Sequence, residues 1–178
     1  QGLAFGWSCP VLPLDSLALV AEDARPALPS GAPSLWVAMD ARMDEVYAAH
    51  YRPMDDDWQA LRPPALWTLP ALQAAWDDEP PHCVAGTALA AFEGRLHADG
   101  ARRLEAGAGR ADALARLARV AWWRGAAVDA SDPDASQRFL DLDPAGGAAC
   151  GCASGPTPGG ALVLLAVAGL LARRRRAR

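Results

Sequence analysis

The sequence predicts an α/β domain whose elements follow the order β-β-β-α-β-α-β-α. Residues 35–39 and 46–51 are rich in aromatic and β-branched side chains, which suit a pleated, half-buried surface. Further along the chain, apolar residues recur at helical spacing between short apolar runs. The two strand-like runs are separated by a charged segment, which predicts a hairpin with a polar turn at Asp40, Arg42, Asp44 and Glu45.

Ahead of the hairpin, the sequence predicts a helix end, a strand and a second helix. Residues 1–6 look like a last helical turn that ends at Gly6. Residues 10–14 predict a short apolar strand, and Asp15 offers a side-chain oxygen to cap the helix that follows. Three prolines and a glycine within residues 26–33 then predict a linker.

After the hairpin, residues 61–68 predict a third strand. The hydroxyl of Thr68 suits an N-cap, and Pro70 fits the first turn of the helix that it would begin. Residues 83–88 predict an apolar strand that leads into a further helix.

Gly86 and Thr87 stand where that strand meets its helix. A close backbone approach and free helix amides at such a junction suit a phosphate group. A plain tight turn explains the same two residues, and the sequence alone does not decide between these interpretations.

The strongest helical pattern spans residues 110–124 and follows a short strand at residues 102–105. Gly125 stands where a helix C-terminus favours glycine. We expect the apolar face to pack on the sheet that carries Val37 and Val46, because a helix must bury such a stripe. This face comprises residues at positions i, i+3, i+4 and i+7, namely Leu114, Leu117, Ala118 and Ala121.

Three segments, QGLAFG (1–6), PVLPLDSL (10–17) and VAMDARMDEVY (37–47), resemble the bacterial TsaB (YeaZ) family. The resemblance extends to about Gly125. It implies the second half of an actin-like (ASKHA) ATPase fold, β-β-β-α-β-α-β-α, and a relation to peptidase M22-like proteins. Family members carry further strands and a Gly-rich segment ahead of residue 1, so we expect the chain to be a fragment or to begin at a misplaced start.

This resemblance divides the chain into four expected regions. Residues 1–30 would be the remnant of a first actin-like half, and residues 31–128 the second half. Residues 129–160 would form a flexible linker, and residues 161–178 a short apolar helix with an Arg-rich end.

The resemblance implies a cytoplasmic, non-catalytic subunit that supports threonylcarbamoyl transfer to adenosine 37 of tRNA. The implied partners are a TsaD-like catalytic subunit and a TsaE-like ATPase, and a homodimer is compatible with the family. No cofactor is expected to bind directly, whereas ATP or ADP at the partner interface fits the family. The residues expected at an interface or near a nucleotide are Asp40, Arg42, Asp44, Glu45, Gly86 and Thr87. For the first four, a solvated hairpin turn is the simpler explanation.

No catalytic or metal-binding constellation is visible in the sequence. His50, His82 and His97 are dispersed, without the paired spacing of a zinc peptidase helix. Cys9 and Cys83 have no neighbours at zinc-site spacing, and they define no disulfide framework. The rival interpretation, a glycoprotease-like enzyme, is therefore not favoured.

The charge distribution argues against autonomous binding of nucleic acid. All 17 basic residues are arginines, and the 21 acidic residues all lie at or before Asp143. The body of the chain is therefore acidic, whereas phosphate binding needs clustered positive charge.

The C-terminal region departs from the family. Cys150-Gly151-Cys152, an apolar stretch at residues 161–172 and five arginines at residues 173–178 resemble the sorting tails of some exported bacterial proteins. A helix of this length would reach only about 18 Å, short of the roughly 30 Å hydrocarbon core of a bilayer. The alternative function is therefore an exported or membrane-tethered surface protein, associated with the membrane through residues 161–178.

Overall fold

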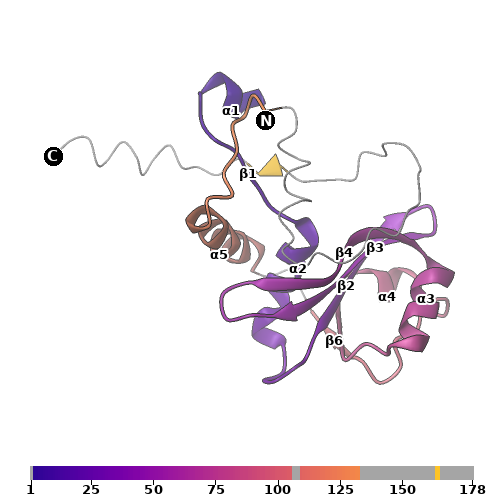
Figure 1. Cartoon of the computed structure of the whole chain (residues 1–178). Helices are drawn as coiled ribbons and strands as arrows, with labels where there is room; N and C mark the ends of the chain where they lie inside the picture. The colour runs from indigo at the N-terminus through magenta and orange to yellow at the C-terminus, as the bar shows by residue number, and fades with distance from the viewer. Residues whose placement is uncertain (1, 106–108, 133–162, 165–178) are drawn as a thin grey trace. The chain divides into compact units, whose positions relative to one another are not determined.

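The computed structural model describes residues 2–105, 109–132 and 163–164 (Figure 1). The chain forms two compact units, Asp15–Leu117 and Gln1–Leu14 with Ala118–Arg178. The regions predicted from the sequence, with boundaries at residues 30, 128 and 160, were assigned from the family resemblance and not from compactness. The division into two units does not test these boundaries, and they stay a prediction.

The larger unit contains a five-stranded sheet in the order β4-β3-β2-β5-β6. The strands β2, β3 and β4 are antiparallel, and β5 and β6 run parallel to β2. The predicted order β-β-β-α-β-α-β-α is therefore confirmed from β2 to α5. Along the chain the elements are α2 (Ser16–Ala24), the 3-10 helix η1 (Arg25–Ala27), β2 (Leu35–Arg42), β3 (Glu45–Pro53), β4 (Trp58–Thr68), α3 (Leu69–Asp78), β5 (Cys83–Ala85), α4 (Ala88–Ala91), β6 (Arg102–Leu104) and α5 (Arg110–Trp123).

Two strands differ from their predicted bounds for simple reasons. β4 begins at Trp58 and continues through Pro63 and Pro64, which an edge strand tolerates because one side of it needs no ladder hydrogen bonds. β5 ends at Ala85 because Gly86 turns the backbone at a positive φ of 111°.

The sheet buries apolar side chains on both faces. On one face, Trp36 and Val46 pack in a core with Leu72 and Trp76 of α3 and with Leu89 of α4. On the other face α2 packs against β2. Successive residues of a strand point to opposite faces. Leu35 and Val37, the buried residues on either side of Trp36, therefore lie on the α2 side of the sheet.

Both helix caps expected from the sequence are confirmed. Asp15 Oδ1 accepts a hydrogen bond from the Leu17 amide at 2.8 Å. Thr68 Oγ1 accepts one from the Ala71 amide at 3.4 Å. Asp15 also accepts a short hydrogen bond from the Tyr51 hydroxyl, which ties the start of α2 to β3.

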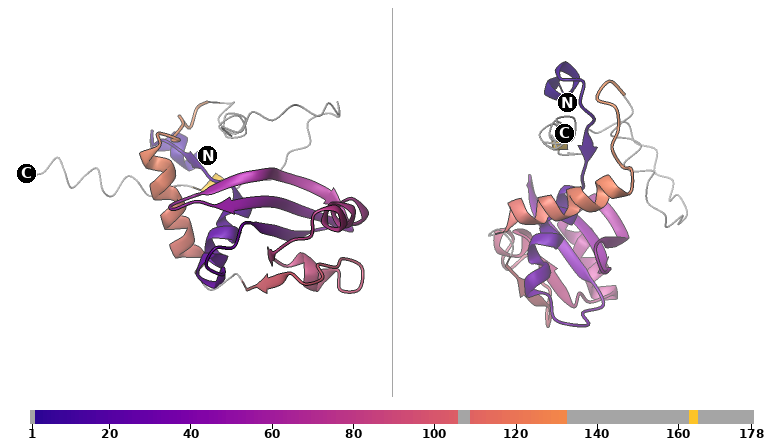
Figure 2. Two further views of the ribbon diagram at one scale, coloured as in Figure 1. Left: turned by 60° about the horizontal axis from the view of Figure 1, so that its bottom comes forward. Right: turned by 90° about the vertical axis from the view of Figure 1, so that its left-hand side faces the viewer.

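The helix α5 forms where it was predicted, but its docking differs from the prediction. Leu117 is buried as expected, and Ala113 is buried in addition. Val37 and Val46 cannot form one docking face, because they lie on opposite faces of the sheet. Val46 belongs to the core beside α3, whereas Val37, which pairs with Ala49, points to the other face. The polar contacts of α5 instead reach α2 through Arg116, and this part of α5 lies next to α2 in Figure 2.

A buried carboxylate, Glu22 of α2, links this helix to η1, β4 and α5. Its Oε1 accepts from Arg116 Nε of α5 at 2.7 Å. Its Oε2 accepts from Arg25 Nε at 2.6 Å and from Trp58 Nε1 of β4 at 2.9 Å. Glu22 is only 4% exposed, so its charge depends on these donors. We call these four residues the Glu22 cluster.

In the smaller unit, α1 (Gly2–Gly6) and β1 (Leu12–Pro13) form within the segments expected to be a helix end and a strand. Val11 bridges to Val128, and β1 pairs with β7 (Val163–Leu164). At residues 163–164 the structure has a strand where the sequence predicted a helix, because β1 offers its backbone as a pairing partner. The rest of that predicted helix lies outside the described residues. Within the described part of the chain, no helix is both long and apolar enough to cross a membrane.

Candidate functional site

The predicted site residues lie at the tip of the β2–β3 hairpin and at the β5–α4 junction. Three consecutive residues of the tip, Arg42, Met43 and Asp44, adopt positive φ angles of 65°, 52° and 61° although none is glycine. Asp40 Oδ1 accepts a hydrogen bond from the Arg42 amide at 2.8 Å, and the strand register shifts between these two residues. The Asp40 carboxylate therefore shapes the turn.

The β5–α4 junction packs directly against β2. The hydroxyl of Thr87 accepts a hydrogen bond from the Asp40 amide at 3.2 Å. A Cβ on Gly86 would lie 2.2 Å from the carbonyl oxygen of Ala38, so only glycine allows this approach. The structure thus brings Asp40, Gly86 and Thr87 together, although the segments that carry them are far apart in the sequence of the larger unit.

An ion pair that the sequence did not indicate extends this surface. Arg95, which follows α4, donates from Nη1 to Asp44 Oδ1 at 2.8 Å. The hydrogen bond and the positive charge of Arg95 lower the pKa of Asp44. Beside it, Met43 is 91% exposed at the tip of the hairpin. We call Asp40, Arg42, Met43, Asp44, Glu45, Gly86, Thr87 and Arg95 the hairpin surface.

The hairpin surface is better suited to binding than to chemistry. The Asp40 carboxylate shapes the turn, the Asp44 carboxylate pairs with Arg95, and the Thr87 hydroxyl already accepts a backbone hydrogen bond. In the parts of the chain that the structure describes, no group of three or more His, Cys, Asp or Glu side chains could hold a metal ion. Contact of Gly86 and Thr87 with a nucleotide stays a prediction, and the packing against Ala38 and Asp40 explains both residues without it.

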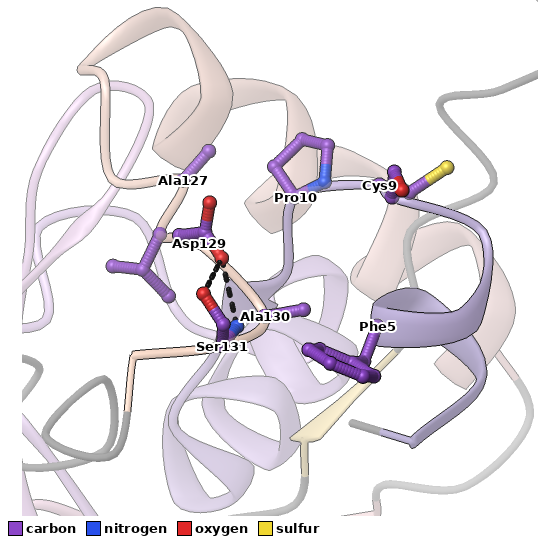
Figure 3. A pocket seen from close by; sticks show the side chains of 9 residues that line it. Phe5, Cys9, Pro10, Ala127, Asp129, Ala130 and Ser131 are labelled. Atoms are coloured by element: carbon purple, nitrogen blue, oxygen red, sulfur yellow. Dashed lines mark hydrogen bonds between the residues drawn. The ribbon is translucent and has the colours of Figure 1, made fainter.

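A separate pocket of about 440 Å³ lies in the smaller unit (Figure 3). Asp129 Oδ1 accepts from the amide of Ser131 at 2.7 Å and from its hydroxyl at 2.5 Å, and these bonds lower the pKa of Asp129. The Cys9 thiol on its wall donates to the carbonyl of Trp7 at 3.4 Å and has no histidine among the lining residues. The lining comprises Phe5, Ser8, Cys9, Pro10, Ala127, Val128, Asp129, Ala130 and Ser131. None of the predicted site residues contributes to it.

The comparisons with known proteins agree with this fold. Residues 1–79 match the family model of TsaD, tRNA N6-adenosine threonylcarbamoyltransferase. YeaZ from Pseudomonas aeruginosa is 31% identical with a TM-score of 0.55, over 74% of this chain and 61% of that chain. A crystal structure of an uncharacterized protein with similarity to peptidase YEAZ, also from Pseudomonas aeruginosa, is 30% identical with a TM-score of 0.58, over 74% of this chain and 60% of that chain. No curated protein sequence matches the chain.

The sheet order and the helices define a mixed α/β protein with the layout of one actin-like half. The chain is similar to the YeaZ (TsaB) proteins in sequence and in fold, and this similarity confirms the resemblance seen in the sequence. It spans about three fifths of the length of the two solved structures.

Proposed function

We propose that this chain is a non-catalytic partner subunit in the threonylcarbamoyl modification of tRNA adenosine. The observation that carries the proposal is the likeness to YeaZ at 31% identity over 74% of the chain. The match of residues 1–79 to the TsaD model supports a place in the same modification system. On this proposal a TsaD-like subunit performs the transfer, a TsaE-like ATPase assists it, and the complex acts in the cytoplasm.

The hairpin surface is the proposed contact with the TsaD-like subunit. Met43 supplies an exposed apolar centre, and the Asp44–Arg95 pair supplies a charged rim. An apolar centre with a polar rim is the usual anatomy of a protein interface. In this arrangement the chain binds no cofactor itself, and ATP or ADP lies at the partner interface. The acidic body of the chain leaves tRNA binding to the partners.

Met43→Glu is expected to weaken binding to the TsaD-like subunit at least about tenfold, because it places a charge at the centre of the contact. The measurement is the dissociation constant of the full chain and its partner by calorimetry. Met54→Glu is the matched control, because Met54 is 50% exposed and follows the other end of β3. Equal affinities for the Met43→Glu and Met54→Glu variants would place the contact elsewhere on the chain.

The alternative, a surface protein held at the membrane through residues 161–178, rests on residues that lie almost wholly outside the described part of the chain. Cell fractionation separates the two proposals. A partner subunit is expected in the soluble fraction together with the TsaD-like protein. A surface protein is expected in the membrane fraction.

A further inference from the structure

His50 of β3 lies in an aromatic cluster between the sheet and α3. Its ring stacks on Trp36 with centroids 4.7 Å apart and planes at 10°. Trp36 in turn meets Trp76 of α3 edge to face at 6.0 Å. His50 is 4% exposed, and its buried Nε2 has no hydrogen-bond partner among the described residues.

The surroundings of His50 disfavour a second positive charge. Arg62 stands directly opposite His50 on β4, and its guanidinium lies 5.8 Å from the centre of the Trp36 ring. Like charges directly opposite each other on neighbouring strands destabilise a sheet. The acid whose charge acts on His50, Glu79 at the end of α3, already faces Arg62 with a nitrogen–oxygen distance of 3.7 Å.

These groups shift the titration of His50 in one net direction. Burial lowers the pKa of His50 most, Glu79 raises it, and the charges of Arg62, Arg52 and His82 lower it further. The folded protein therefore releases the His50 proton more readily than the unfolded chain, whose histidine pKa is about 6.5.

We propose that neutral His50 is an acid-sensitive lock on the layer between the sheet and α3, and that its protonation loosens α3. The imidazolium would have to be desolvated beside Arg62 with no acceptor for its Nε2–H. It would therefore leave the stack with Trp36, and Trp36 would keep only its edge-to-face contacts with Trp67 and Trp76. This property is independent of the proposed subunit function.

The sign of the effect follows from linkage. Because the folded pKa of His50 is lowered, the unfolded chain binds more protons between about pH 6.5 and that lower value. Stability from neutral His50 is then fully present above about pH 6.5 and is lost as pH falls toward the folded pKa. The equilibrium constant for unfolding rises by up to about tenfold per pH unit in that window.

The first test compares urea unfolding of the full chain at pH 7.5 and 5.5 by circular dichroism. The wild-type protein and His97→Gln, which removes an exposed histidine, are expected to show the same several-fold rise in the unfolding constant at pH 5.5. His50→Phe keeps a flat ring against Trp36 and is expected to lose most of that rise. An unchanged wild-type constant, or an undiminished rise in His50→Phe, would overturn the proposal.

The second test needs no variant. Hydrogen exchange, corrected for the intrinsic effect of pH, is expected to be faster at pH 5.5 for amides of α3 than for amides of α2. A His50 ring that titrates by NMR at or above pH 6.5, or equal acceleration in α2 and α3, would contradict the lock.

Discussion

Gly86→Ala is expected to destabilise the larger unit by more than about 3 kcal/mol, and to lower the yield of soluble protein sharply. The new Cβ would stand 2.2 Å from the Ala38 carbonyl oxygen and 2.9 Å from its carbon. Both atoms are backbone of the central strand β2, so they cannot move aside as a flexible side chain would. The positive φ of 111° adds conformational strain of the kind that costs about 1–3 kcal/mol per residue.

Gly94→Ala separates the two causes. Gly94 also has a positive φ, 79°, but a Cβ there would meet no atom within 4 Å. It is expected to cost only about 1–2 kcal/mol, the strain of a left-handed alanine. The comparison uses the free energy of unfolding in urea. If Gly86→Ala costs no more than Gly94→Ala, the β5–α4 junction does not approach β2 as described.

Glu22→Gln is expected to cost about 2–3 kcal/mol at pH 7. The neutral amide keeps the size of the side chain but leaves Arg25 and Arg116 without a charged acceptor, and removing one member of a buried ion pair is strongly destabilising. The expected loss of stability is smaller than is usual for a fully buried pair. The side chains of Arg25 and Arg116 are 25% and 43% exposed, so solvent screens their charges.

The pH dependence of this variant identifies the cause. Burial alone would raise the pKa of Glu22, but hydrogen bonds from Arg116, Arg25 and Trp58 together lower it below the ordinary value of 4.5. The stability that the carboxylate contributes is therefore present above about pH 4.5 and is lost as pH falls through the lower folded pKa. The difference between wild type and Glu22→Gln should shrink accordingly in acid. Glu93→Gln, at an exposed position, is the control and should show almost no difference at any pH.

Features set by neighbouring residues were predictable from the sequence. The charged turn between two strand-like runs, the caps at Asp15 and Thr68, and the helix at Arg110–Trp123 depend on short-range chemistry, and all are confirmed. The face assignment of Val37 and Val46 failed, because strand register across a bulged hairpin depends on the turn geometry.

Contacts between distant segments were not predictable in the same way. Arg95 pairs with Asp44, which lies 51 residues earlier, and Arg116 binds Glu22, 94 residues earlier. The sequence contains 17 arginines, and nothing in it indicates which acidic residue each of them binds. Gly86 and Thr87 were singled out for a local reason, but their contacts with Ala38 and Asp40 became visible only in the folded sheet.

Threonylcarbamoyl transfer to tRNA by reconstituted subunits tests the proposed function most directly. The full chain alone is expected to give no more product than a heat-denatured sample, because no catalytic constellation is found among the described residues. A TsaD-like subunit with its TsaE-like ATPase is expected to form product efficiently only when the folded chain is added. Transfer by the chain alone, or transfer by the partners that is unaffected by the chain, would contradict its assignment as a non-catalytic partner subunit.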